Sequence, residues 1–289
     1  MDDRLEAIDK KYQDLINILQ SLGKVLVAFS GGVDSSLLLK IAKDVLKENV
    51  IAVTALSETT SAAERKAAVH LAKLFKVKHL MIESRDLDLP DFVKNVPEKC
   101  YICKMNRFKA LVELARQQEM DYVVDGENVD DQNDYRPGIR ASRELGIRSP
   151  LSEAGLTKED IRQLSKKLGL PTWNKPSAAC LASRIPYYQK ITAQKLKQVE
   201  DGEAYLRKQG FLLQVRVRHE GATARIELAE EEIPKLMESA VRTGVVMYFK
   251  TLGFKFVAVD LKGYRMGSLN RSLPPTGQNP SPPTGRAGT

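Results

Sequence analysis

Short apolar runs alternate with amphipathic patterns over the first two thirds of the chain. Apolar runs predict buried strands at 24–29 and 50–56 and further strands at 77–82 and 121–125. Patterns of helical period, the last opened by a Thr-x-x-Asp capping box, predict helices at 5–22, from 37, 61–75, 105–116 and 157–168. Strands that alternate with helices of this length predict an α/β fold with a doubly wound, Rossmann-like parallel sheet.

The pattern changes after residue 191. A helix at 193–209, a hairpin of strands at 212–218 and 222–228, a helix at 231–252 and a strand at 254–260 are expected. We interpret this order as a second, smaller α+β domain, which gives domains at 1–186 and 187–266. Residues 267–289 are rich in Pro, Gly, Ser and Thr and have too few apolar side chains to fold, so a disordered tail is expected.

Composition narrows the possible partners. The 289 residues include 45 Lys and Arg against 37 Asp and Glu, a net charge of +8 that suits anionic ligands such as nucleotides. The basic residues are spread along the chain, so nucleic acid is the less favoured partner. The first residues are charged, and no apolar run approaches the length of a membrane span, so we expect a cytoplasmic protein without membrane contact.

The turn between the first strand and the next helix is the strongest candidate for chemistry. It contains Ser30, Gly31, Gly32, Asp34 and Ser35. The first N–H groups of a helix have no intrahelical partners, and glycine lets a phosphate approach the main chain, so this turn predicts an anion site. The alternative is an ordinary turn capped by Asp34 or Ser35. A P-loop is excluded because no Lys follows the second glycine.

Polar residues also follow the second and fourth strands. In a parallel sheet, these ends face the ligand crevice. Ser57 and Glu58 lie where an adenine would be held, and the loop after the fourth strand contains Gly126, Asp125, Asp130 and Asp131. The three carboxylates are candidates for holding Mg²⁺ against phosphates, and the alternative is a polar loop with Asx turns. Arg136 could contact a phosphate or pair with Asp134.

The cysteines are three in number, which is unsuitable for a disulfide framework. Cys100 and Cys103 form a CxxC motif ahead of a helical pattern, and Cys180 follows in a proline-rich loop at 171–186. Three thiolates can hold a 4Fe-4S cluster and leave one iron open, whereas structural zinc would require a fourth ligand. A redox pair or a chance spacing is the alternative for the CxxC.

Charged residues alternate along the predicted hairpin. Arg216 and Arg218 are two positions apart and share one face, as do Arg225 and Glu227 on the partner strand. The alternative is a solvated, salt-bridged sheet face. Ser183 and Arg184, which follow Cys180, belong to a loop of the length and composition that often carries function.

These motifs carry a resemblance to known proteins. The SGGVDS turn resembles the PP-loop of ATP pyrophosphatases, which cleave ATP between the α- and β-phosphates and adenylylate a substrate oxygen. Together with PTWNKPSAACLASRIPY, NDYRPG and VRVRHEGATARIEL, it resembles the LarE family of sulfur transferases, which make the nickel-pincer nucleotide cofactor. The resemblance runs from about residue 5 to 267 and implies ATP, Mg²⁺ and a small nucleotide substrate.

The resemblance also implies a mechanism. In that family, ATP adenylylates a carboxylate of pyridinium-3,5-biscarboxylic acid mononucleotide, and sulfur then displaces AMP. Some members sacrifice the cysteine that matches Cys180, and others use a three-cysteine 4Fe-4S cluster with an external sulfide source. Cys100 and Cys103 place this chain with the second group.

Further site residues follow from the same resemblance. Acidic residues near the cysteine match Glu203 and Glu227, whereas a third acidic position of the family is Lys235 here. Arg184, Arg216 and Arg218 are expected to hold the substrate, because arginine binds carboxylate and phosphate in bidentate fashion. Ser183 and Arg136 belong to the expected substrate site, and a homo-oligomer is expected.

Three other functions compete with this interpretation. A tRNA thiolase uses the same ATP and cluster chemistry, but usually needs an added RNA-binding module. A non-catalytic Fe-S or zinc nucleic-acid-binding module has no need of a PP-loop. An amidating synthetase has no use for three cysteines.

Overall fold

The computed structural model describes residues 2–132, 137–176 and 179–265. The chain divides into two compact units. The first comprises Met1–Ala182 and Tyr188–Glu200, and the second comprises Ser183–Tyr187 and Asp201–Thr289. The expected domain boundary after residue 186 stays a prediction. Arg136 and the expected tail at 267–289 lie outside the described residues.

The first unit is built on a parallel sheet. Its described strands lie in the order β3-β2-β1-β4, with bounds β1 Val25–Ala28, β2 Val50–Leu56, β3 Lys78–Glu83 and β4 Tyr122–Val124. All neighbouring strands pair in parallel, and Val25 is opposite both Val50 and Tyr122. The predicted α/β class and parallel sheet are confirmed. The central strands β1 and β2 are buried along most of their length, whereas β3 at the edge is not.

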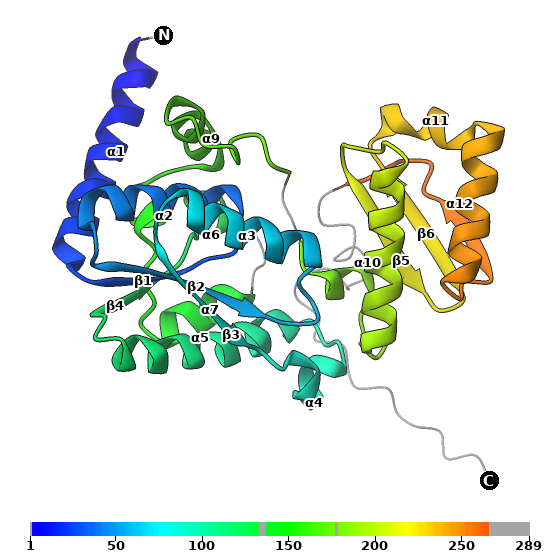
Figure 1. Ribbon diagram of the computed structural model, residues 1–289, viewed down its shortest axis with the longest axis horizontal. Coiled ribbons are helices and arrows are strands. Elements are labelled where there is room, and N and C mark those ends of the chain that lie inside the picture. Colours follow the sequence, from blue (N-terminus) through cyan, green and yellow to red (C-terminus); the bar gives the residue numbers. More distant parts are fainter. Residues whose placement is uncertain (1, 133–136, 177–178, 266–289) are drawn as a thin grey trace, which may run out of the picture. The chain divides into compact units, whose positions relative to one another are not determined.

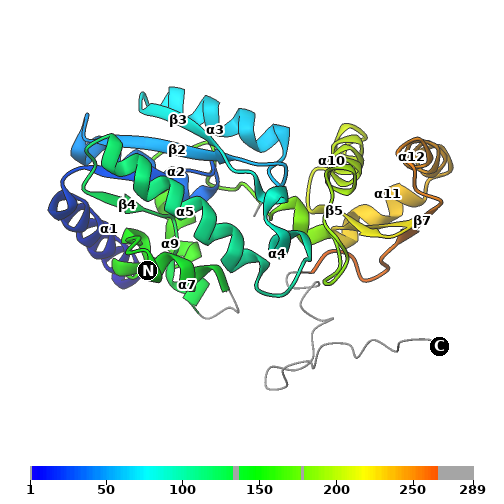
Figure 2. The same ribbon diagram turned by 90° about the horizontal axis from the view of Figure 1, so that it is seen from below.

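Helices cover both faces of this sheet (Figures 1 and 2). One face packs against α1 Asp2–Leu22, α2 Val33–Leu46, α3 Ala62–Leu74, α8 Pro150–Glu153 and α9 Lys158–Lys167. The other face packs against α5 Lys99–Gln117, which buries Phe108 and Leu111 against Leu26. Successive strand residues point to opposite faces, so Val25 and Val27 lie in the first layer and Leu26 lies in the second.

Several short helices of this unit were not predicted. They are η1 Asp86–Asp88, α4 Pro90–Val93, α6 Val129–Gln132, α7 Pro137–Glu144 and η2 Leu181–Arg184. Such segments are too short to show a helical period. The capping box at Thr157 is confirmed, since its hydroxyl accepts from the Asp160 N–H at 3.2 Å and its own N–H donates to the Asp160 carboxylate at 3.1 Å. Helix α5 begins at Lys99, so the CxxC lies inside the helix and not ahead of it.

The second unit contains a smaller mixed sheet in the order β5-β6-β7. Its described elements are α10 Ala193–Lys208, whose first half belongs to the first unit, β5 Val215–Glu220, β6 Thr223–Leu228, η3 Glu230–Glu232, α11 Ile233–Met237, α12 Ser239–Thr251 and β7 Phe256–Val259. Strands β5 and β6 are antiparallel, and β7 runs parallel to β6. Leu206, Phe211 and Phe249 are fully buried in its core.

The prediction of one helix at 231–252 is wrong. The segment divides into η3, α11 and α12 because Glu238 adopts an extended conformation with ψ of 133°. Pro234 occupies the first turn of α11, a position that the fixed φ of proline favours.

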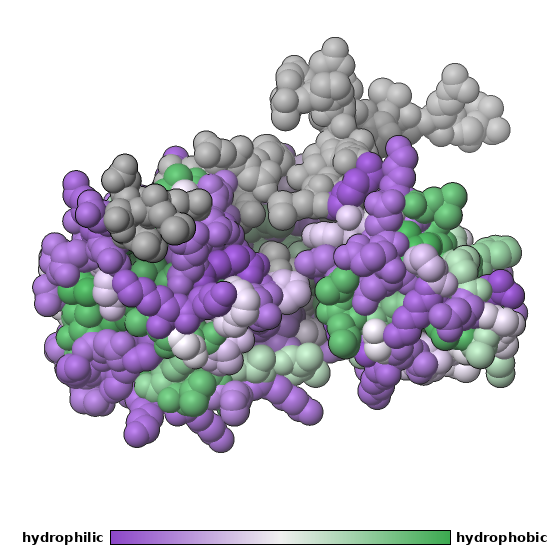
Figure 3. All heavy atoms as spheres, turned by 90° about the horizontal axis from the view of Figure 1, so that it is seen from above, coloured by the Kyte–Doolittle hydropathy of each residue, from purple (hydrophilic) through white to green (hydrophobic). Residues whose placement is uncertain are grey.

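Within the described residues, none of the helices is both long and apolar enough to cross a membrane. In the face of the molecule that Figure 3 shows, hydrophilic residues cover most of the surface and surround smaller hydrophobic patches.

Candidate active site

The turn between β1 and α2, residues 30–35, is called the glycine turn here. Gly31 has φ of +70°, and a Cβ there would lie 3.1 Å from the Cα of Ala68. A Cβ on Gly126, after β4, would lie only 2.9 Å from the Ser35 nitrogen. Glycine is therefore required at both positions, because the main chain of the turn packs between α3 and the loop that follows β4.

The serine hydroxyls of the turn face each other. Ser30 Oγ and Ser35 Oγ are 3.0 Å apart, and the Gly32 N–H points to Ser30 Oγ at 3.4 Å. Within the described residues, no side chain caps α2 at Gly32, so capping by Asp34 or Ser35 is contradicted. The start of α2 thus keeps the arrangement of main-chain N–H groups and hydroxyls that anions bind.

Two lysines from distant parts of the sequence reach the glycine turn. Lys175 Nζ donates to the Gly31 carbonyl at 2.7 Å, and Lys158 Nζ forms an ion pair with Asp34 at 2.5 Å. Asn128 contacts the other Asp34 oxygen at 3.4 Å. Sequence reasoning missed both lysines, since neither belongs to a local motif. The turn lacks the lysine of a P-loop, but the fold brings positive charge to it.

The carboxylates after β4 have defined partners. Asp125 is buried and accepts from the hydroxyls of Ser149 at 2.8 Å and Ser142 at 3.3 Å. Asp130 accepts from the Lys158 N–H at 2.7 Å, and Asp131 accepts from the Asn128 N–H at 3.1 Å. These contacts are of the kind that the alternative of a hydrogen-bonded polar loop predicts.

Glu127 was not predicted from the sequence. It is buried, and its Oε2 has no hydrogen-bond partner among the described residues. Burial raises the pKa of its carboxyl, and the neighbouring Asp125 and Asp131 act in the same direction, against Lys104. A buried carboxyl with an unsatisfied oxygen belongs to a site more often than to a surface loop.

The three cysteines gather at the start of α5. Cys100 and Cys103 lie in its first turns. Burial raises the pKa of both thiols, and the nearby Cys180 acts in the same direction. Cys100 and Cys180 are exposed and Cys103 is buried. Buried Lys99 donates to the Asn95 side chain and, at 3.5 Å, to the Ala182 carbonyl. The structure therefore brings Cys180 beside the CxxC.

Cys103 also contacts a buried carboxylate. Its Sγ donates to Asp86 at 3.7 Å, and Asp86 also accepts from Arg107 at 2.5 Å and from Ser57 at 2.6 Å. Burial would raise the pKa of the Asp86 carboxyl, but Arg107 outweighs this effect and holds that pKa below its usual value. The Thr59 carbonyl accepts from the Leu181 N–H at 2.9 Å. The expected adenine loop, with Ser57, is thus joined to the cysteines through Asp86. Sequence reasoning gave no role to Asp86.

Within the described residues, no three His, Cys, Asp or Glu side chains are arranged to hold a metal ion. Cations lie near Cys100, because Lys99, Lys104 and Arg107 each lower the pKa of its thiol, although burial outweighs them and leaves that pKa raised. Three cysteine sulfurs are the kind of donor that an iron–sulfur cluster uses, but the described structure does not arrange them as a metal site.

In the second unit, buried arginines pair with buried glutamates. Arg184 Nε donates to Glu203 at 2.8 Å, and Ser183 Oγ lies 3.1 Å from Arg184 Nη1. Burial would raise the pKa of the Glu203 carboxyl, but Arg184 reverses this effect and holds that pKa below its usual value. The Val217 N–H also donates to Glu203, at 3.2 Å, so this glutamate joins the Ser183–Arg184 segment to β5.

The hairpin arginines gather around a second glutamate. Arg218 donates to Glu227 at 2.7 Å, and Arg225 donates to its other oxygen at 2.8 Å. Arg216 stacks over the Tyr264 ring at 5.1 Å, and its side chain is only 4% exposed. The register confirms that these residues share a face, because Arg216 lies opposite Glu227 and Arg218 lies opposite Arg225. The alternative of a solvated, salt-bridged face is right about the ion pairs, but Arg216, Arg218 and Glu227 are buried and not solvated.

Arg216 lies in an unfavourable environment for its positive charge. Burial lowers the pKa of its guanidinium, and the nearby charge of Arg184 lowers it further, against Glu203. Positive charge is therefore concentrated around Arg216. An anion bound there would reduce the repulsion between Arg216 and Arg184. Lys235, at the position where an acid was expected, donates to the Gly210 carbonyl at 2.9 Å.

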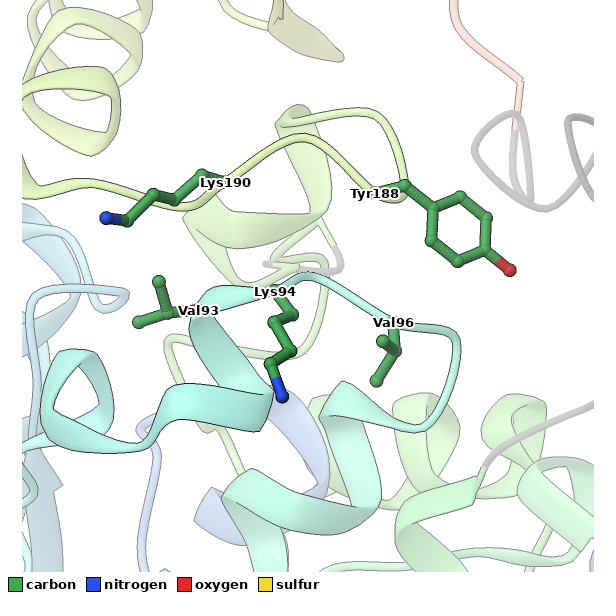
Figure 4. Close-up of a pocket in the computed structure, with 5 residues that line it drawn as sticks. All are labelled: Val93, Lys94, Val96, Tyr188 and Lys190. Carbon is green, nitrogen blue, oxygen red and sulfur yellow. The ribbon is translucent and has the colours of Figure 1, made fainter. Parts of the chain in front are cut away.

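A separate cavity in the first unit does not resemble a site. It has a volume of about 420 Å³ and is lined by Val93, Lys94, Val96, Tyr188 and Lys190. Figure 4 shows that Lys94, Tyr188 and Lys190 point in different directions, so their polar atoms do not converge on one ligand.

Comparison with known proteins agrees with the geometry of the first unit. Residues 4–142 match the family model of the PP-loop domain. An uncharacterised protein from Synechocystis sp. is 41% identical over 266 residues, which are 92% of this chain and 99% of that protein. The pyridinium-3,5-bisthiocarboxylic acid mononucleotide synthase of Lactiplantibacillus plantarum is 40% identical over 273 residues, 93% and 97% of the two chains. An uncharacterised protein from Methanocaldococcus jannaschii is 32% identical over 244 residues, 84% and 91% of the two chains.

Proposed function

The chain belongs to the LarE family of ATP-dependent, sulfur-inserting PP-loop synthases, and on that basis we propose that it acts on pyridinium-3,5-biscarboxylic acid mononucleotide. The products would be the thiocarboxylates, AMP and pyrophosphate. The observation that best supports this proposal is the 40% identity to the Lactiplantibacillus synthase, which extends over 93% of this chain and includes both units.

The first step activates a carboxylate. A carboxylate oxygen attacks the α-phosphorus of ATP, the bond to the bridging oxygen breaks, and pyrophosphate leaves with the electron pair. Ser30, Gly31, Gly32 and Ser35 would stabilise the charge on the phosphates through main-chain N–H groups and hydroxyls. Asp34 is positioned by Lys158 and Asn128. Gly126 permits the close packing behind Ser35.

Mg²⁺ is the proposed metal of this step. It usually binds through one or two carboxylates together with substrate phosphates and waters, so a pre-built protein cage is unnecessary. We propose Asp125 and Asp131 as its carboxylates, in the loop whose Gly126 packs against Ser35. Glu127 is a further candidate in this loop because its Oε2 has no partner among the described residues.

The second step replaces oxygen with sulfur. A sulfide attacks the carbonyl carbon of the adenylate, and the carbon–oxygen bond to AMP breaks, leaving the thiocarboxylate. We propose that Cys100, Cys103 and Cys180 hold a 4Fe-4S cluster, on the basis of their grouping beside Lys99, Lys104 and Arg107. When bound, the cluster would supply a sulfide on the iron that no cysteine holds.

The second unit would provide the substrate's anion contacts. We propose that Arg184, Arg216 and Arg218, with Ser183, bind the phosphate and carboxylates of the mononucleotide. Glu203 and Glu227 would hold the guanidinium planes in place through the ion pairs described above. Arg136, which lies outside the described residues, is also proposed to contact the substrate.

The test measures both half-reactions in the protein reconstituted with iron and sulfide under anaerobic conditions. With ATP, Mg²⁺, sulfide and the biscarboxylate mononucleotide, it should release AMP and pyrophosphate and make more than one thiocarboxylate per chain. Its mass should remain unchanged. Cys103→Ser should stop repeated turnover but still release pyrophosphate, because Cys103 lies outside the glycine turn.

Two outcomes would contradict the proposal. Release of ADP and phosphate would exclude the adenylylating step. A chain that becomes lighter by the mass of H₂S, with product never exceeding enzyme, would mean that Cys180 is consumed and that the CxxC has another role.

A further inference from the structure

Lys175 reaches the glycine turn from a segment that lies far away in the sequence. Its ammonium donates to the Gly31 carbonyl at 2.7 Å, across 144 positions of the chain. An ammonium has three donor directions, and the Gly31 carbonyl uses one of them. Since the next residues of the turn form the predicted anion site, the remaining N–H groups of Lys175 lie beside that site.

The segment that carries Lys175 is held in place by α9. Arg162 donates to the Trp173 carbonyl at 2.8 Å and to the Lys175 carbonyl at 3.0 Å. The Lys175 N–H donates to the Thr172 carbonyl at 3.0 Å. The main chain from Trp173 to Lys175 is therefore held against α9, and the Lys175 side chain reaches the turn from this segment.

The charge of Lys175 is influenced by Glu64, but the two side chains form no ion pair. Within the described part of the chain, Lys175 forms no ion pair, whereas Lys158 is paired with Asp34 at 2.5 Å. Burial lowers the pKa of the Lys175 ammonium, and Glu64 acts in the opposite direction. A partly desolvated cation that lies beside an anion site, without an ion pair among the described residues, favours a ligand with high negative charge.

We propose that Lys175 is the phosphate-binding cation of the glycine turn and that it contacts the β- and γ-phosphates of ATP and the departing pyrophosphate. The proposal rests on the ATP-cleaving step of the proposed function. When the bond between the α-phosphorus and the bridging oxygen breaks, negative charge accumulates on pyrophosphate. Lys175 stabilises that charge by hydrogen bonding and keeps its own proton.

This assignment explains how the turn functions without a lysine of its own. In a P-loop the lysine is part of the loop sequence. Here the same charge comes from the segment after α9, on the residue that precedes Pro176. Lys158 has a different task, because its ammonium is committed to Asp34.

The experiment uses the full-length chain and inorganic pyrophosphate with Mg²⁺ as the probe. Calorimetry compares pyrophosphate and AMP binding to the wild type, Lys175→Met, Lys175→Arg and the matched control Lys166→Met. Lys166 is an exposed residue of α9 whose ammonium lies 4.9 Å from the Trp173 ring, so it borders the same segment without reaching the glycine turn. Thermal unfolding of each variant shows whether it is folded.

Lys175→Met should weaken pyrophosphate binding roughly ten- to a hundredfold, the size expected for the loss of a charge-assisted hydrogen bond. AMP binding should change by less than about twofold, because AMP lacks the β- and γ-phosphates. Lys175→Arg should restore part of the pyrophosphate affinity, since it keeps the charge. Lys166→Met should behave as the wild type.

Unchanged pyrophosphate affinity in Lys175→Met would overturn the proposal. So would an equal loss of AMP and pyrophosphate binding, which would indicate that Lys175 only holds the Gly31 carbonyl in place. If Lys175→Met does not fold, Lys175→Gln takes its place, with the same two outcomes. If the wild type cleaves ATP to ADP, the proposed function itself is wrong. If the wild type forms AMP and Lys175→Met keeps its pyrophosphate affinity, only the assignment of Lys175 is wrong.

Discussion

Gly126 offers the sharpest test of the phosphate site, because its replacement by alanine adds one carbon atom at a known place. The new Cβ would lie 2.9 Å from the Ser35 nitrogen and 3.2 Å from the Ser35 Cα. Ordinary contacts begin near 3.4 Å, so the loop after β4 and the start of α2 must separate by about half an ångström. Both partners are main chain, and neither can move aside as a side chain would.

The expected consequences can be worked out from this displacement. Overpacking costs about 1–3 kcal/mol of unfolding free energy, partly offset by about 0.4–1 kcal/mol because alanine restricts the unfolded chain more than glycine does. A misplacement of about 1 Å can cost a hundredfold in rate, so half of that distance predicts roughly a tenfold fall in the rate of pyrophosphate release at saturating ATP.

Pyrophosphate release and urea unfolding together check this prediction. Gly244→Ala is the control. That glycine lies inside α12, and among the described residues outside the helix its added Cβ would meet a side-chain atom, the Tyr205 hydroxyl at 3.2 Å, and no main chain. A helix favours alanine over glycine by about 1 kcal/mol, so the control should be as stable as the wild type or more stable. If Gly126→Ala releases pyrophosphate at the wild-type rate, the packing behind Ser35 does not position the phosphates.

The remaining predictions concern charged groups. Asp34→Ala should abolish pyrophosphate release and leave the fold intact, which product assays and circular dichroism check together. Asp86→Ala should lower the unfolding free energy by about 3–5 kcal/mol, because Arg107 would lose its buried partner; urea titration measures this loss. The folded pKa of Glu203 lies below its unfolded value of about 4.3, so its stabilising effect is present above that pH and is lost as pH falls through the folded pKa. Glu203→Gln should therefore reduce stability at neutral pH and flatten its acid dependence; unchanged pH dependence of urea unfolding would contradict the role of Arg184.

The parts of the fold that the sequence predicted well are those with a strong local signal. The run Val50–Leu56 coincides with β2, because a strand buried on both faces is apolar throughout its length. The capping box at Thr157 was visible for a similar reason, since all of its chemistry lies within four residues. The helix at 231–252 failed because its apolar period continues across Glu238, and nothing local marks the extended residue there.

The residues of the candidate site also fall into those with a local sequence signal and those without one. The glycine turn and the CxxC could be found because their residues are adjacent in sequence. Lys175 and Asp86 could not, since each acts through contacts with residues far away, Lys175 with Gly31 and Asp86 with Arg107. The burial of the arginines could not be predicted either. Alternating charges along β5 were compatible with a solvated face, and the structure shows that Arg216 and Arg218 are buried.

The chain passes three times between its two units, after residues 182, 187 and 200. A single cut after residue 200 therefore keeps the first unit whole but separates residues 183–187 from the rest of the second unit. A fragment that begins at Asp201 would contain Glu203 but lack Arg184, and the buried carboxylate would lose its ion-pair partner. That loss, about 3–5 kcal/mol, is a large part of the 5–15 kcal/mol that stabilises a typical domain. Expression of the smaller unit alone would thus require residues 183–187 to be joined to it. A gene divided at residue 200 would place Arg184 in one piece and its partner Glu203 in the other.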